Sequence, residues 1–146
     1  MDLSALGNSL GRVYISVKGN VMEGQQFVML ALGTDGPTFK GATFGRKDND
    51  TINLYEYVTE TGSKSSKALI TTSKQQGSNE IPRRGGLFSI FDTQSYVYIM
   101  ITATNTAYDG NFGQVISGMD VVDKAASSKY AITDITISEC GIVLNY

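Results

Sequence analysis

The clearest pattern of hydrophobic and polar positions lies in the last third of the chain. Residues 112–126 read as a short strand, a turn at Ser117-Gly118, and a helix with apolar side chains at i, i+3 and i+7. The apolar face of this helix consists of Met119, Val122 and Ala126. Within residues 132–144, apolar and polar side chains alternate from Ile135 onward, which predicts a strand with two unlike faces.

The first half of the chain predicts a strand, a turn and a helix. Val13, Ile15 and Val17 alternate with polar residues, so a strand with one buried side is expected there. A helix follows over residues 23–32, and Gly33 ends it. The apolar side chains that recur at helical spacing are Phe27, Leu30 and Ala31. Further short strands are predicted at residues 39–44, 68–72, 87–91 and 96–104, which gives about seven or eight strands and two helices in all.

Length and composition limit the chain to one domain. With 146 residues, 41% hydrophobic content and a net charge of −2, residues 1–146 form a single globular domain with a sizeable core. The low, mixed charge lacks the basic surface that nucleic acids require, and no apolar run reaches the ~20 residues of a membrane span. We therefore expect no nucleic-acid partner and no membrane insertion. Because the N-terminus lacks a signal-peptide pattern, we expect an intracellular soluble protein, cytoplasmic by default, with organelle import as the alternative.

The residue types present exclude several kinds of catalysis and metal binding. The chain has no histidine and one cysteine, which excludes Ser-His-Asp and Cys-His sites, internal disulfides and the usual zinc sites. Cys140 is expected in a core strand as a small buried hydrophobic residue. Asp48 and Asp50 have the spacing of two calcium-loop ligands, but Asn53 stands where a glycine is needed and Thr59 where the bidentate glutamate is needed. We therefore expect no metal site and no cofactor.

Several sequence blocks together resemble the cyclophilins, the family of peptidyl-prolyl isomerases. The blocks are LGRVYISV from Leu10, QQFVMLALG from Gln25, FKGATFGR from Phe39, GGLFSIF from Gly85, FGQVISGMDVV from Phe112 and ITISECGIVL from Ile135. They cover nearly the whole chain and match best at its two ends. The resemblance implies a mainly β fold, a closed antiparallel β-barrel of about eight strands with two flanking α-helices.

Cyclophilins direct an arginine at the proline amide and hold the proline ring in an apolar pocket. By the resemblance, Arg46 in the FGR motif takes the place of this catalytic arginine. The pocket phenylalanine and methionine would fall at Thr51 and Ile52, and the glutamine two residues further on would fall at Leu54. Arg46 is thus the one catalytic group that the resemblance clearly preserves, and the segment after it no longer matches the family motif.

The other pocket positions are substituted as well. The resemblance places Phe91 where the family has a small alanine, Val97 at a glutamine and Ile99 at the second pocket phenylalanine. Ala107 stands at the tryptophan, and Tyr108 beside it belongs to the same degenerate proline pocket. The loop between Phe91 and Val97 is shorter than the family's glycine-rich loop, and the insert that carries the family's histidine is missing. The barrel and helix motifs are kept while the catalytic face is replaced.

The retention of the fold motifs and the replacement of the catalytic positions favour a binding role over catalysis. We expect a degenerate cyclophilin domain, a pseudoenzyme that acts as a protein-binding or structural subunit or adaptor in a larger assembly, with little or no isomerase activity and no cyclosporin binding. Tyrosine is enriched at interfaces, and the chain has several: Tyr55, Tyr57, Tyr96, Tyr98 and Tyr108. An active but divergent prolyl isomerase that uses Arg46 is the alternative. A cyclophilin-like barrel that binds a small ligand is a third possibility.

Overall fold

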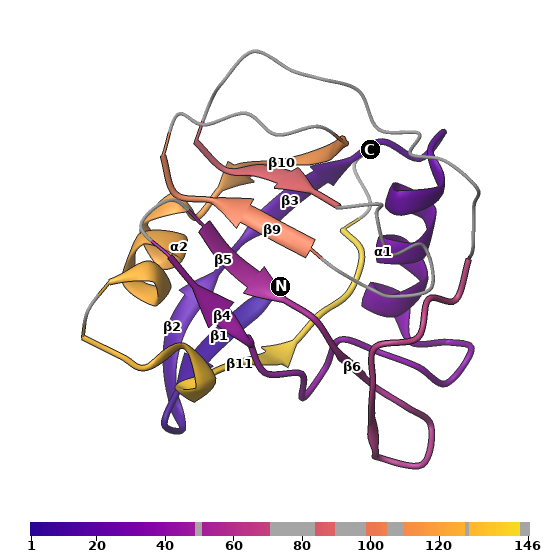
Figure 1. Cartoon of the computed structure of the whole chain (residues 1–146), viewed down its shortest axis with the longest axis horizontal. Coiled ribbons are helices and arrows are strands. Elements are labelled where there is room, and N and C mark those ends of the chain that lie inside the picture. Colours follow the sequence, from indigo (N-terminus) through magenta and orange to yellow (C-terminus); the bar gives the residue numbers. More distant parts are fainter. Residues whose placement is uncertain (49–50, 71–83, 90–98, 105–109, 128, 144–146) are drawn as a thin grey trace.

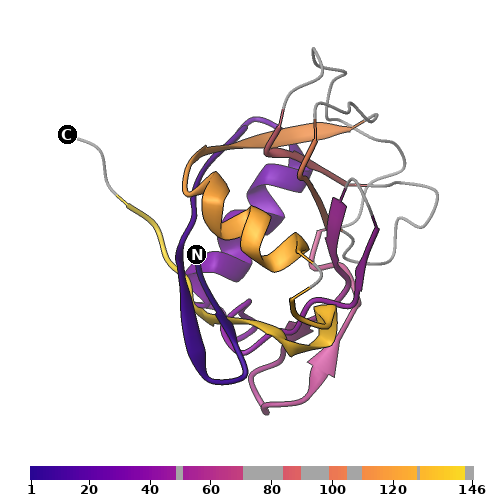
Figure 2. The ribbon, with the colours of Figure 1, turned by 90° about the vertical axis from the view of Figure 1, so that its left-hand side faces the viewer.

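The computed structural model describes residues 1–48, 51–70, 84–89, 99–104, 110–127 and 129–143. Within these ranges the chain is mainly β, and its strands pair antiparallel. Figure 1 shows the helices α1 (Met22–Leu32) and α2 (Met119–Ala126) on opposite sides of the strands. Figure 2, turned by 90°, shows the two helices one behind the other. The prediction of a mainly β fold with two helices is confirmed.

The described strands form three sheets. The first has the order β11-β1-β2 and consists of β1 (Asp2–Ala5), β2 (Asn8–Arg12) and β11 (Ile135–Glu139). The second has the order β3-β10-β8-β9-β5-β4 and consists of β3 (Tyr14–Val17), β4 (Arg46–Lys47), β5 (Thr51–Leu54), β8 (Gly86–Phe88), β9 (Ile99–Thr102) and β10 (Asn111–Ser117). The third pairs β6 (Tyr57–Val58) with β7 (Lys64–Ser65). A short 3-10 helix, Ile132–Asp134, precedes β11.

No closed barrel is found among the described residues, so the expected cyclophilin barrel is not confirmed. The two larger sheets are nevertheless joined at two corners. At one corner, β2 continues directly into β3 through the buried Val13. At the other, the segment before β4 bonds to β11, where Gly41 N–H donates to the Ile137 carbonyl at 2.7 Å and Phe44 N–H donates to the Ile135 carbonyl at 3.0 Å.

One hydrophobic core draws side chains from both larger sheets and both helices. The largest side chains that are fully buried are Phe39, Phe44, Phe112, Leu3, Leu30, Ile52, Leu87, Ile101, Ile135, Ile137 and Val13. Burial of one such side chain stabilises the fold by about 1.5–3 kcal/mol. On α1 the buried side chains include Phe27, Leu30 and Ala31, which confirms the predicted apolar face of this helix.

Helix α2 begins at the predicted turn, and its buried face matches the predicted one only in part, through Val122. Its buried residues are Val121, Val122 and Ala125, whereas Met119 and Ala126 are only partly buried. The reason is a close approach to β2: a Cβ on Gly11 would lie 2.7 Å from Cγ2 of Val121. The glycine leaves room for this valine, so the helix turns Val121 toward the sheet.

Two segments that were predicted to be strands, residues 39–44 and the described part of 68–72, do not form strands. Residues 39–44 turn back after α1, with Phe39 N–H donating to the Leu30 carbonyl at 3.0 Å, and make only a single bridge from Thr43 to Thr136. Residues 68–70 are not a strand either, because the N–H groups of Leu69 and Ile70 donate to Oε1 of Gln26, a side chain in place of a neighbouring strand. Residues 71 and 72 lie outside the described ranges.

Other expectations are met in part. Strands β8 and β9 confirm the described parts of the strands predicted at 87–91 and 96–104, and β3, β10 and β11 also lie where strands were predicted. The β1–β2 hairpin was not predicted, since most of its residues are small or polar, although Leu3 and Ala5 are buried in the core. The core placement of Cys140 is wrong: the residue follows β11, is half-buried, and its Sγ lies 3.7 Å from Oγ1 of Thr38.

A comparison of the stability losses in Gly118→Ala and Gly62→Ala distinguishes the effect of a steric clash from the effect of backbone strain. Both glycines have positive φ, 92° and 85°, so each alanine should cost about 1–2 kcal/mol for the left-handed backbone alone. A Cβ at Gly118 would lie 2.3 Å from the Arg12 carbonyl oxygen, whereas nothing lies within 4 Å of one at Gly62. We expect Gly118→Ala to lower the free energy of unfolding by about 1–3 kcal/mol more than Gly62→Ala in chemical denaturation. Equal losses would contradict the tight packing of this turn.

Candidate functional site

Three of the predicted pocket positions come together in the second sheet. Leu54 on β5 pairs with Ile99 on β9, and Ile52 pairs with Ile101. The exposed fractions of Ile52, Leu54 and Ile99 are 0%, 2% and 6%, and all three belong to the hydrophobic core. These side chains stabilise the core instead of lining an open surface for a proline ring.

Arg46 occupies the first position of β4, where its backbone pairs with Asn53 on β5. Its neighbour Lys47 reaches the loop after α2 and donates from Nζ to the carbonyls of Ser127 and Tyr130 at 2.5 and 2.6 Å. Lys47 therefore ties β4 to the loop that follows α2. The remaining predicted positions, Phe91, Val97, Ala107 and Tyr108, lie outside the described residues.

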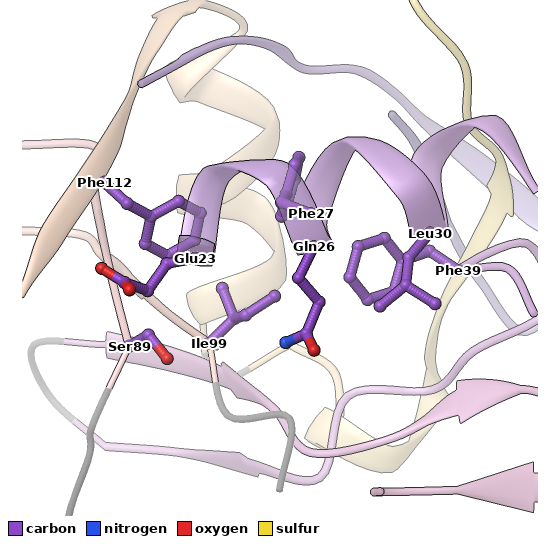
Figure 3. A pocket seen from close by; sticks show the side chains of 8 residues that line it. All are labelled: Glu23, Gln26, Phe27, Leu30, Phe39, Ser89, Ile99 and Phe112. Carbon is purple, nitrogen blue, oxygen red and sulfur yellow. The ribbon is translucent and has the colours of Figure 1, made fainter. Parts of the chain in front are cut away.

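A pocket that the sequence did not predict lies between α1 and the second sheet (Figure 3). Eight of the described residues line it: Glu23, Gln26, Phe27, Leu30, Phe39, Ser89, Ile99 and Phe112. It encloses about 210 Å³, part of which is open to solvent, and leaves about 10 Å³ for the centre of a water-sized group. Among the described residues, Ile99 is the one predicted site position that lines it. The accessible space therefore holds at most a single small group.

Aromatic rings form much of the pocket wall. The ring of Phe27 lies between two others, with centroid distances of 5.2 Å to Phe39 and 5.8 Å to Phe112. The rings are tilted by 52° and 54°, within the range of geometries that aromatic pairs prefer. Figure 3 places Glu23, Ser89 and Phe112 together near the start of α1, and Leu30 and Phe39 near its other end.

Glu23 is the unusual residue of this pocket. Its exposed fraction is 5%, and neither carboxylate oxygen has a hydrogen-bond partner within the described part of the chain. The position in the first turn of α1 offers partial compensation, because the positive end of the helix dipole stabilises a negative charge by about 0.3–1 kcal/mol. A buried carboxylate normally requires a counter-charge or several donors, so this site is electrostatically incomplete.

The first turn of α1 is held against the strand that precedes it. A Cβ on Gly24 would lie only 2.0 Å from the carbonyl oxygen of Lys18, so this approach requires glycine. Gln26 fixes the next turn, because its Oε1 accepts hydrogen bonds from Leu69 N–H at 2.8 Å and Ile70 N–H at 3.1 Å. Together these contacts hold Glu23 inside the pocket.

Other buried polar residues are neutral and largely satisfied. Thr102 Oγ1 accepts from Gly86 N–H at 2.9 Å, and Asn111 Nδ2 donates to the Gly113 carbonyl at 3.0 Å. Asn53 donates from Nδ2 to Thr51, but its Oδ1 has no partner among the described residues. An orphaned amide oxygen costs far less free energy than an orphaned carboxylate. Glu23 therefore stands out as the candidate binding group.

No protein-family model matches the chain. Within the described ranges, no three His, Cys, Asp or Glu side chains gather as metal ligands, and Asp48 accepts two hydrogen bonds from Thr51 at the start of β5. No helix in the described part of the chain is long and apolar enough to cross a membrane.

Glu23→Gln should stabilise the protein at neutral pH, in contrast to most substitutions at buried positions. The amide keeps the shape of the side chain and removes the buried charge, so we expect the free energy of unfolding to rise by about 1–3 kcal/mol in urea denaturation. Glu56→Gln is the matched control, because Glu56 is exposed and the same change there should have almost no effect. Loss of stability in Glu23→Gln would mean that the carboxylate has a partner.

Proposed function

We propose that this chain is a degenerate cyclophilin-like domain that binds another protein, as a subunit or adaptor of a larger assembly, with little or no prolyl isomerase activity. The observation that carries the proposal is the burial of β5 and β9, the strands to which the family resemblance assigns pocket positions. All four residues of β5 and all four of β9 are buried. A substrate proline would have to displace core side chains to reach Ile52, Leu54 or Ile99.

The proposal includes a cyclophilin-like closure of the sheets. The two corners described above support it, because each lies where one larger sheet passes into the other. The corner at Val13 lies within the sequence block that resembles the family's first strand. The corner at residues 41–44 lies in the block that resembles the strand carrying the family's arginine. Closure at both corners would leave fewer free strand edges, which is the usual advantage of a barrel.

The surface supports a protein partner through residues other than the expected tyrosines. Tyr57 is a core residue, 4% exposed, whose hydroxyl donates to the Lys67 carbonyl at 2.6 Å, so its expected interface role is wrong. Tyr14 on β3 and Ile116 on β10 instead expose 38% and 67% of their surface. Their strands are neighbours, with Tyr14 paired to Ser117, the residue after Ile116. An exposed apolar pair of this kind suits a protein interface.

The other expected tyrosines add little to this support. Tyr55 is half-buried. Tyr96, Tyr98 and Tyr108 lie outside the described residues.

The alternative is a divergent isomerase that depends on Arg46. Turning an X-Pro bond requires crossing a barrier of about 18–20 kcal/mol that amide resonance creates, so a catalyst must hold the proline ring while a donor weakens that resonance. Ile52, Leu54 and Ile99, at three of the resembling pocket positions, are apolar core residues that offer no such donor. Without a positioned ring, one arginine loses most of the gain from proximity.

Isomerase activity is tested by NMR exchange between the cis and trans forms of an Ala-Pro-Phe peptide, with wild type and Arg46→Ala compared directly. We expect neither protein to accelerate exchange, because the pocket positions on β5 and β9 lie in the core. We also expect no cyclosporin binding in a parallel titration. Acceleration by wild type that disappears in Arg46→Ala would establish the divergent isomerase instead.

The proposed interface is tested by substitution of its two exposed apolar residues. We expect Tyr14→Ser combined with Ile116→Ser to lower the mass of the native complex measured by size-exclusion chromatography with light scattering, while the denaturation midpoint stays near the wild-type value. Leu32→Ser is the matched control, since Leu32 is also exposed, at 48%, but lies at the end of α1. A wild-type chain that runs as a monomer in its native extract would refute the subunit role.

A further inference from the structure

We propose that the pocket at the start of α1 binds a primary alkylammonium group, with the carboxylate of Glu23 as its counter-ion. This inference goes beyond the proposed function and does not depend on it. It rests on a side chain that is 5% exposed, carries a charge, lines a pocket, and has no partner among the described residues.

The charge of the pocket selects a cation. Among the described residues that line it, Glu23 is the only charged one. A bound water could donate hydrogen bonds to the carboxylate, but it would leave the buried charge uncompensated. A cationic ligand supplies both hydrogen-bond donors and the missing charge, whereas an anionic ligand would be repelled.

The size of the pocket selects an ammonium group among the organic cations. The deepest space holds one water-sized group. An ammonium has that size and offers three donors, which two carboxylate oxygens and the hydroxyl of Ser89 can accept. A guanidinium is planar and larger, with five donors spread over three nitrogens. An ammonium therefore fits where a guanidinium does not.

The wall of the pocket suits the chain that carries the ammonium. Phe27, Ile99 and Phe112 line the pocket with apolar side chains, which suit a neighbouring methylene group, and an aromatic ring face within ~6 Å of a cation attracts it. Lysine-like side chains and simple alkylamines share this chemistry, a point charge on a flexible aliphatic stem. The ligand class is therefore a primary amine on an unbranched chain.

The oxygen atoms that the described side chains offer in this pocket are too few to bind a metal ion such as Ca²⁺. Gln26 Oε1 already accepts two backbone N–H groups, from Leu69 and Ile70. The lining side chains then leave two carboxylate oxygens and one hydroxyl, whereas Ca²⁺ takes 6–8 oxygen ligands. An ammonium requires only three acceptors, which matches the set in the pocket.

The test is a two-dimensional NMR titration of the ¹⁵N-labelled full chain with n-butylammonium chloride. We expect saturable shifts of the amides of Gln26, Phe27 and Ile99 in wild type. Affinity should fall about tenfold or more in Glu23→Gln and by a smaller factor in Ser89→Ala, while Glu56→Gln should bind as wild type does. n-Butanol, a neutral ligand of the same length, should not distinguish wild type from Glu23→Gln.

Two outcomes would overturn the proposal. One is the absence of saturable shifts in wild type, and the other is equal affinity of butylammonium for wild type and Glu23→Gln. An Ala-Lys-Ala peptide with blocked ends identifies the source of the amine. Tighter binding of this peptide than of butylammonium supports a lysine side chain of another protein, and weaker binding supports a free small amine.

Discussion

The close approach of α1 to the strand that precedes it is the constraint on which the core and the pocket both depend. Gly24 permits the approach, because the Cβ of any side chain there would lie 2.0 Å from the carbonyl oxygen of Lys18, far inside van der Waals contact. The approach brings Phe27 against Phe39 and Phe112, so three elements share one aromatic cluster. It also carries Glu23, one residue earlier, into the interior. The packing that stabilises the helix therefore places an unpaired carboxylate inside the protein.

Strand pairing explains why the positions that the family resemblance assigns to a pocket are apolar. Alternation puts Ile52 and Leu54 on one face of β5, and the register sets them opposite Ile101 and Ile99. These four side chains fill the core, where a polar catalytic group would be buried without a partner. Apolar residues at these positions are therefore what the observed packing requires. A catalytic surface and this core cannot both use the same side chains.

Local patterns predicted the elements whose structure is determined by their own residues. Helices α1 and α2 and strands β10 and β11 follow from apolar periodicity and from glycine at their ends. The failures depend on tertiary partners: residues 68–70 bond to a side chain of α1, and residues 39–44 turn because Phe39 bonds back to Leu30. The face of α2 depends on a gap at Gly11 that no local pattern reveals.

The candidate site shows the same limit of sequence reasoning. Resemblance to a family placed Ile52, Leu54 and Ile99 together, and the register of β5 with β9 does bring them together, although in the core. The Glu23 pocket could not be predicted, because an acidic residue in the first turn of a helix is an ordinary feature that the helix dipole explains. The only local signal is the glycine that follows it, which permits the close approach and hence the burial.

The unpaired carboxylate of Glu23 is energetically unfavourable in a core whose other residues are apolar or largely hydrogen-bonded. Replacement of a buried ionic group by an apolar one of similar size is often neutral or stabilising, so stability alone does not explain a carboxylate at this position. Such conflicts concentrate at functional sites, where an interaction with a ligand compensates for what folding loses. The apolar face of β5 and β9 contains no comparable conflict. The physical signs of binding therefore lie at the start of α1, and Ile99 is the one described position marked by the family resemblance that lines the same pocket.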